Sequence, residues 1–308
     1  MELSSLIAAL PGDVAQGVIW GIMALGVFYT FRILNFADLT VDGSFATGGA
    51  VAVVLITNGV PVPVAMLASL VCGVLAGVVT GLLHTLLGIP GILASILTQI
   101  SLYSVNLNIL GGKANVAVSV DRFPLMVSLR FIPKTILISI IFTVVIVLIA
   151  YWYFGTEQGS AIRATGSNPN MSKAQGININ AMTVLTLGIS NGIVALSGAL
   201  LAQYQGFADI NMGRGAIVIG LAAVIIGEVL GHAVFGKDMN FMVKMFCVVF
   251  GGVIYYIVIG IVLWLKMPTN DLKLFTAIVV AIFLAVPYLK SKANSSFKKA
   301  AKRGGSQS

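Results

Sequence analysis

Polar and ionisable side chains that could act on a solute or an ion stand at three places in an otherwise apolar sequence. The segment 35–43 (NFADLTVDG) contains four of them, Asn35, Asp38, Thr40 and Asp42. The segment 91–110 contains a longer series that includes Thr98, Gln99, Tyr103 and Asn106. The third place is Glu228, in the middle of the apolar stretch GLAAVIIGEVLGH. Because polar groups are costly in an apolar environment unless they are hydrogen-bonded or hydrated, each place predicts either a polar pathway or a specific contact between helices.

Both interpretations are open at each place. The segment 35–43 is either a broken segment that lines a transport route or an ordinary cytoplasmic turn in which Asp42 caps the next helix. The polar residues of 91–110 either bond neighbouring helices or line a pathway, and their number favours the pathway. Glu228 is either functional or paired with a nearby base, or it lies at the cytoplasmic end of its helix beside His232.

Several catalytic and metal-binding motifs are absent from the sequence. The Gly-Gly-Lys at 111–113 is followed by Ala114 and lacks the leading glycine of a P-loop, so we do not expect this chain to hydrolyse ATP by itself. H-E-x-x-H does not occur, and His84 and His232 are isolated. We therefore expect no catalytic residue, no metal site and no cofactor bound by this chain.

The elements that must hold these side chains are membrane-spanning helices. The chain has 308 residues, of which 58% are hydrophobic and 9% are charged, whereas a soluble domain has about 25% charged residues. Apolar stretches near the length of about 20 residues that crosses a bilayer recur from end to end. The sequence thus predicts an all-α polytopic membrane protein, with one transmembrane domain over 1–290. We expect about nine spans, near 12–31, 43–58, 62–87, 90–110, 132–154, 181–204, 216–235, 240–265 and 272–289.

The distribution of charge predicts the orientation of these spans. The formal net charge is +8, and a third of the basic residues lie together after the last span, at Lys290, Lys292, Lys298, Lys299, Lys302 and Arg303. A basic segment in this position is typical of the cytoplasmic side, next to anionic lipid, and does not indicate nucleic-acid binding. We expect a disordered cytoplasmic tail over 291–308, a cytoplasmic loop over 155–180, and an N-terminus outside.

The loop predicted over 155–180 contains the signals of one short helix. Asn168 is a favourable N-cap, Pro169 suits the first helical position, and Gly176 suits the residue after the end. These signals define a helix of about two turns from Pro169 to Gln175. Since so short a helix is not stable alone, it must dock against another surface.

The segment 159–177 also carries a family resemblance. Its pattern G-x-A-I-R-A-x-G-x-N-P-x-x-x-x-A-x-G-I resembles the coupling loop of the permeases in ABC importers of the branched-chain amino acid, ribose and nucleoside type. The stretches NFADLTVDGSFATGGA and MGRGAIVIGLAAVIIGEVLG are similar to two further segments of that family. The resemblance extends over most of the chain and is strongest to a subgroup thought to take up tryptophan, tyrosine or similar compounds. Asp38 and Glu228 depart from residues common in relatives, so the substrate cannot be copied from them.

The resemblance implies a permease without catalytic residues of its own, in the plasma membrane. It implies a homodimer around a central pathway, driven by two copies of a separate ATPase that binds ATP and Mg²⁺, with an extracellular lipoprotein that delivers the solute. The ATPase would contact Arg163, Gly166, Asn168, Pro169, Ala174 and Gly176. The candidates for lining or gating the pathway are Asn35, Asp38, Asp42, Thr98, Gln99, Tyr103, Asn106 and Glu228.

Other functional classes stay open on the sequence. An ion-coupled secondary transporter could use Glu228 or Asp42 as its ion site, although such carriers usually show several intramembrane charges in broken helices. An intramembrane enzyme would need a nucleophile with its base, or a set of metal ligands. An amino acid is the favoured solute, and a nucleoside or a sugar is the alternative.

Overall fold

Long helices account for most of the described chain. The computed structural model describes residues 3–236 and 239–264, together with six isolated residues between 274 and 285. Among these residues, eight helices are long and apolar enough to cross a membrane. The protein is therefore an all-α polytopic membrane protein, as the sequence predicts. The predicted ninth span, 272–289, and the predicted tail, 291–308, lie outside the two continuous ranges.

Short elements interrupt the series of long helices at four points. The first long helix, α1, continues into a π-helical segment, η1; a three-residue strand precedes α5 and another follows α8; and two short helices lie between α5 and α8. The elements are α1 (Leu3–Phe28), η1 (Tyr29–Ile33), α2 (Thr40–Thr57), α3 (Val62–Thr85), α4 (Gly91–Ile109), β1 (Asn115–Ala117), α5 (Ile132–Phe154), α6 (Glu157–Ser167), α7 (Pro169–Ala174), α8 (Ile179–Gln205), β2 (Phe207–Asp209), α9 (Ala216–Phe235) and α10 (Phe241–Trp264).

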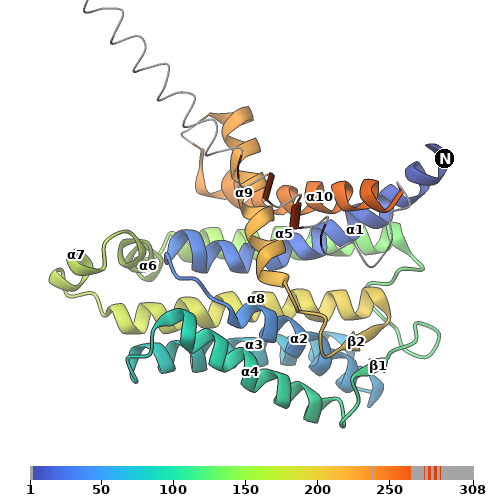
Figure 1. Ribbon diagram of the computed structural model, residues 1–308, viewed down its shortest axis with the longest axis horizontal. Helices are drawn as coiled ribbons and strands as arrows, with labels where there is room; N and C mark the ends of the chain where they lie inside the picture. The colour runs from blue at the N-terminus through green and yellow to red at the C-terminus, as the bar shows by residue number, and fades with distance from the viewer. Residues whose placement is uncertain are drawn as a thin grey trace, which may run out of the picture.

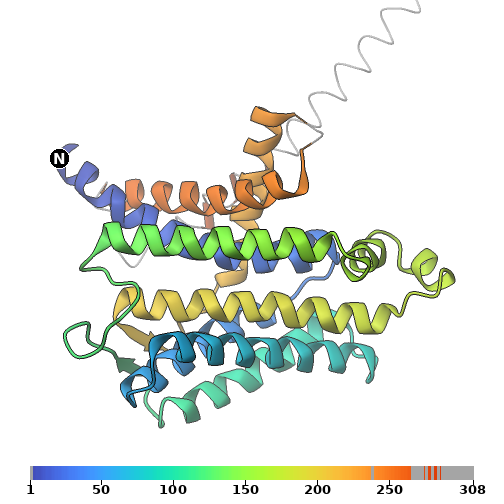
Figure 2. The same cartoon turned by 180° about the vertical axis from the view of Figure 1, so that it is seen from behind.

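Different elements lie at the two ends of the bundle. Figure 1 and Figure 2 show α6 and α7 projecting at one end, here called the α7 end, beside the end of α1. The N-terminus and the antiparallel pair β1–β2 lie at the opposite end, here called the β end. α1 runs from the β end to the α7 end, and α8 runs the other way. The long axes of these helices therefore separate two surfaces on which different partners could bind.

The observed boundaries agree with the first eight predicted spans, with two informative differences. α1 begins at Leu3 rather than near residue 12, because Pro11 is accommodated inside the helix. α2 begins at Thr40 rather than at 43, because the Asp38 carboxylate accepts a hydrogen bond from the Thr40 amide at 2.9 Å. Helix α6 was not predicted.

A short repeat, which is not evident on first inspection of the sequence, relates the two halves of the chain. Phe-Ala-Asp occurs at 36–38, after α1 and η1, and again at 207–209, after α8. Each copy follows a residue with a positive φ, 57° at Asn35 and 80° at Gly206. In each copy the aspartate accepts a hydrogen bond from the amide two residues on. Since α1 and α8 run in opposite directions, the two copies form an inverted repeat, and a shorter helix follows each, α2 or α9.

The bundle core consists of helices packed closely through glycine. The most extensive contacts join α3 to α8 and α1 to α10. A Cβ at Gly77 of α3 would clash with the Leu187 carbonyl group of α8, and one at Gly17 of α1 would clash with the Val253 backbone of α10. Backbones can approach this closely only where no side chain stands between them. This packing fixes the relative depth of α1 and α8, and thus of the breaks that follow them.

Candidate functional site

Asp38 stabilises the junction between α2 and α8. Its side chain is 1% exposed, and its second carboxylate oxygen accepts a hydrogen bond from the Asn191 amide of α8 at 2.7 Å. The Asn191 carbonyl oxygen in turn accepts from the Ser44 hydroxyl at 2.6 Å. Burial raises the pKa of the Asp38 carboxyl, while hydrogen bonds from Thr40 and Asn191 oppose that shift. The geometry thus places Asp38 within a bonded network between helices.

Asp42 caps a different helix from the one predicted. Its two carboxylate oxygens accept hydrogen bonds from the Gly215 and Ile217 amides, both at 2.9 Å. These amides belong to the first turn of α9, whose N-cap residue, Gly215, has no side chain. One of the two interpretations that the sequence leaves open, that Asp42 caps α2, is wrong, since α2 already begins at Thr40. Gly213 packs on the Asp42 carbonyl oxygen so closely that a Cβ there would clash.

A cavity of about 370 Å³ with polar and apolar lining residues lies between α2, α4 and the segment 210–214. Four of the predicted pathway residues line it, namely Asp42, Gln99, Tyr103 and Asn106. The Asn106 side chain is 1% exposed. Its amide nitrogen reaches the Gly43 carbonyl oxygen at 3.5 Å, and its own carbonyl oxygen finds no partner among the described residues. One residue of the cavity lining therefore has a buried hydrogen-bond acceptor without a partner.

Arg214 also lines this cavity and was missed as a candidate. Its sequence signal is the stretch Met-Gly-Arg-Gly at 212–215, between two predicted spans, where an arginine is unremarkable. Only the return of 210–214 toward the first turn of α2 brings it beside α4. No three His, Cys, Asp or Glu side chains in the described part of the chain gather closely enough to hold a metal ion.

The other predicted pathway residues lie away from the cavity lining. Thr98 is buried, and its hydroxyl donates to the Ala94 carbonyl of its own helix at 3.1 Å. Asn35 occupies the left-handed turn after η1. Glu228 of α9 forms an ion pair with Arg32 of η1. The structure thus supports pairing with a base as the explanation for Glu228.

Helices α6 and α7 form a capped pair at the α7 end. As the sequence predicts, the Asn168 side chain accepts from the Met171 amide at 3.1 Å, Pro169 opens the helix, and Gly176 follows it with φ of 83°. Thr156 caps α6 by accepting from the Gly159 amide. Within α6, Gly166 packs directly on the Ile33 carbonyl oxygen of η1.

Most residues of the predicted coupling set are exposed to solvent. This holds for Arg163, Asn168, Pro169, Ala174 and Gly176, whereas Gly166 is half-buried against η1. The set therefore offers a small exposed surface on α7 and one tight contact with the bundle.

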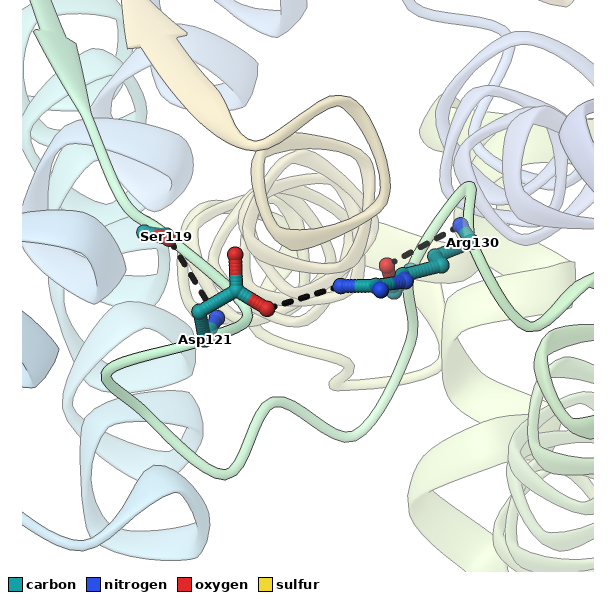
Figure 3. A network of polar contacts seen from close by, with 4 residues as sticks. Ser119, Asp121 and Arg130 are labelled. Atoms are coloured by element: carbon teal, nitrogen blue, oxygen red, sulfur yellow. Dashed lines mark hydrogen bonds and ion pairs between the residues drawn. The ribbon is translucent and has the colours of Figure 1, made fainter.

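The β end is covered by the loop 118–131, which is fastened to the end of α8. The Val118 and Leu129 amides donate to the Gly206 and Tyr204 carbonyl oxygens at 2.8 and 3.0 Å. Figure 3 shows the outer part of this loop, where the Arg130 guanidinium donates to the Asp121 carboxylate at 2.7 Å. Both side chains are largely exposed, so this pair shapes the loop more than it stabilises the fold.

Residues 13–287 match the family described as branched-chain amino acid transport system / permease component. A tyrosine transport system permease protein of Clostridioides difficile (strain R20291) is 39% identical over 284 residues, which cover 92% of each chain. A galactofuranose transporter permease of Escherichia coli (strain K12) is 28% identical over 211 residues, 67% of this chain and 60% of that one.

Among solved structures, the fold is similar to PsaBC from Streptococcus pneumoniae in complex with a Fab. The TM-score is 0.55 at 15% identity, and the match covers 94% of this chain and 100% of that one. A structure described as an inward-facing conformation of a metal-chelate type ABC transporter gives a TM-score of 0.50 at 13% identity, over 91% of this chain and 85% of that one. At these identities the likeness concerns the fold alone.

Replacing Asp42 by alanine tests its role as the cap of α9. Asp42→Ala is expected to lower the free energy of unfolding by about 1–2 kcal/mol, because the amides at the start of α9 lose their acceptors. Amide exchange at 215–217 should become faster, as followed by mass spectrometry on the detergent-purified protein. The control Asp121→Ala, in the exposed ion pair, should change stability by less than about 0.5 kcal/mol. Equal stability and exchange in the two variants would contradict the cap.

Proposed function

The chain belongs to the branched-chain amino acid transport system permease family, and from this premise we propose that it carries an amino acid across the membrane as the permease subunit of an ATP-binding-cassette importer. The observation that carries the proposal is the 39% identity with a tyrosine transport permease over 92% of both chains. The preferred solute is an aromatic amino acid. The weaker match to a galactofuranose permease leaves a sugar as the second candidate.

The contacts of the two candidate acids, Glu228 and Asp42, argue against ion-coupled transport. Glu228 is neutralised by Arg32, and both oxygens of Asp42 accept amide hydrogen bonds. A free carboxylate that could exchange an ion or proton is better suited to ion coupling than a carboxylate held in this way.

The separate ATPase subunit would bind the exposed face of α7. A capped helix of six residues, Pro169–Ala174, projects beyond the bundle on a turn closed by Gly176. Asn168 and Ala174 of this segment and Arg163 of α6 are exposed. Two copies of the permease and two of the ATPase would form the working importer, in the plasma membrane, with the α7 end in the cytoplasm.

A continuous series of contacts could carry movement from α7 to the cavity. Gly166 of α6 packs on the backbone of η1 at Ile33, and Arg32 of η1 pairs with Glu228 of α9. α9 begins at the amides held by Asp42, which lines the cavity. A π-helical segment is a common place for a local rearrangement in a functional helix. Displacement of α6 by the ATPase would thus shift η1 and α9 together and change access to the cavity.

The β end would face outward and bind a receptor lipoprotein. Loop 118–131 is hydrogen-bonded to the end of α8 and does not depend on a partner for its shape. A preformed surface lowers the cost of ordering on association. The receptor would release its solute at this end, close to β2 and the cavity.

The proposal is tested by purifying the tagged full-length chain in mild detergent and identifying its partners by mass spectrometry. Recovery of an ATPase with a P-loop and of a lipoprotein is the expected result. The lipoprotein can then be titrated with tyrosine, tryptophan, leucine and galactose to identify the solute. A well-folded chain that consistently emerges without an ATPase would overturn the importer assignment.

Gly176→Val is expected to uncouple ATP hydrolysis from transport. Valine at φ of 83° strains the backbone by about 1–2 kcal/mol and reorients the end of α7, although a Cβ there meets no neighbour within 4 Å. Solute uptake should fall at least tenfold, while the bundle remains folded and the ATPase remains active. Gly59→Val is the matched control, since Gly59 has φ of 84°, also has no neighbour within 4 Å, and lies between α2 and α3. Normal uptake by the Gly176 variant would show that α7 does not couple.

Exchanging the two charges of the ion pair tests the route through η1 and α9. Glu228→Arg and Arg32→Glu each place like charges together and should lower uptake at least tenfold, whereas the double variant restores opposite charges and should recover most of it. Uptake is measured in cells at equal membrane expression. If each single variant transports normally, the pair takes no part in transmission.

A further inference from the structure

We propose that the cavity between α2 and α4 is a transient binding site for the zwitterionic head of a free amino acid. Arg214 would receive the carboxylate group of the solute, and the carbonyl oxygen of Asn106 would receive its ammonium group. This inference deepens the proposed function and rests on it, since it names the chemistry that the permease itself recognises after the receptor has released the solute.

Asn106 provides the evidence of a built site. Asn106 belongs to the cavity lining and is 99% buried, and its side-chain carbonyl oxygen is left without a partner among the described residues. An unsatisfied buried acceptor costs about 1–3 kcal/mol. Its amide nitrogen is directed to the Gly43 carbonyl oxygen, which fixes the carbonyl oxygen as the free group. The carbonyl oxygen can accept a hydrogen bond from a solute and cannot donate one.

Two opposite charges in one cavity indicate a solute that carries both. Arg214 lines the cavity and takes part in neither ion pair found among the described residues. Asp42 lines it as well, and each of its oxygens accepts one amide hydrogen bond and keeps a further lone pair. Hydrogen bonds between oppositely charged groups are the strong ones in a partly desolvated site. A neutral sugar would leave the Arg214 guanidinium in this cavity without an anionic partner.

The size and apolar lining of the cavity suit one small molecule with a hydrophobic side chain. The volume of about 370 Å³ lies near the lower limit of the 300–1,000 Å³ typical of ligand pockets. Ile100, Tyr103 and Ile210 provide the apolar part. The Tyr103 ring is 45% exposed, so an aromatic solute could pack against it at the mouth of the cavity.

The position of the cavity agrees with transient occupancy. Asn106 lies in the last turn of α4, and Ile210 directly follows β2, so the cavity opens near the β end. Its wall includes Asp42, the residue that holds the start of α9. A movement of α9 would therefore displace one wall, and the retained solute would be released on the path toward the α7 end. Only a weak site permits this release.

The test measures direct binding to the full-length chain in lipid nanodiscs, without receptor or ATPase, by saturation-transfer NMR. The probes are tyrosine, tyramine, which lacks the carboxylate, and 3-(4-hydroxyphenyl)propionate, which lacks the ammonium group. Tyrosine is expected to bind at least tenfold more tightly than either analogue. Equal binding of the three probes, or no binding of any, would overturn the proposal.

Variants assign the two groups separately. Arg214→Gln should weaken tyrosine binding at least tenfold and leave tyramine unaffected, whereas Asn106→Leu should weaken tyrosine and tyramine and leave the propionate unaffected. Asn108→Leu is the matched control, because Asn108 is an exposed residue on the same helix and does not line the cavity. If each variant weakens all three probes equally, or none of them, the assignment is wrong. If the chain binds the three probes in this pattern but copurifies with no ATPase, the binding site is retained and the importer assignment is rejected.

Discussion

The hydrogen bonds from the start of α9 to Asp42 are the interaction on which the interior of this protein depends. Figure 1 shows α2 and α9 beginning part-way along the bundle rather than at its ends. The first amides of such helices have no partner within the helix, and hydrocarbon offers none. Asp42 closes the start of α9, and Asp38 closes the start of α2. Without these carboxylates two helix starts would stand unsatisfied inside the protein.

The breaks in the helices bring polar side chains together inside the bundle, which continuous helices would not do. Because the chain returns along 210–214 before α9 begins, Arg214 reaches the face of α4 that carries Gln99, Tyr103 and Asn106. Because η1 turns out of regular α-helix at the end of α1, Arg32 reaches Glu228. The same two interruptions thus create the cavity and the ion pair, and α9 connects them physically.

The two breaks share a short sequence. Phe-Ala-Asp after a left-handed residue follows one long helix at 36–38 and another at 207–209, although Asp38 closes the start of α2 and Asp42 closes the start of α9. α2 then packs on α8, and α9 packs on α1, so each half supplies a short helix to the long helix of the other. Such repeats are found in many transporters, where one half moves against the other around a central site.

The sequence by itself determined the membrane class, the eight described spans and the cap residues of α7, because hydropathy and capping depend on neighbouring residues. The family could also be predicted, since its signals lie within short stretches such as 159–177. The local sequence did not reveal that Asp42 caps α9, that Glu228 pairs with Arg32, or that Arg214 joins the cavity. The first two contacts connect residues more than 170 positions apart, and a carboxylate looks the same in sequence whether it caps a helix, pairs with a base or binds an ion. Only the packing of the helices through glycine decides which group each carboxylate contacts.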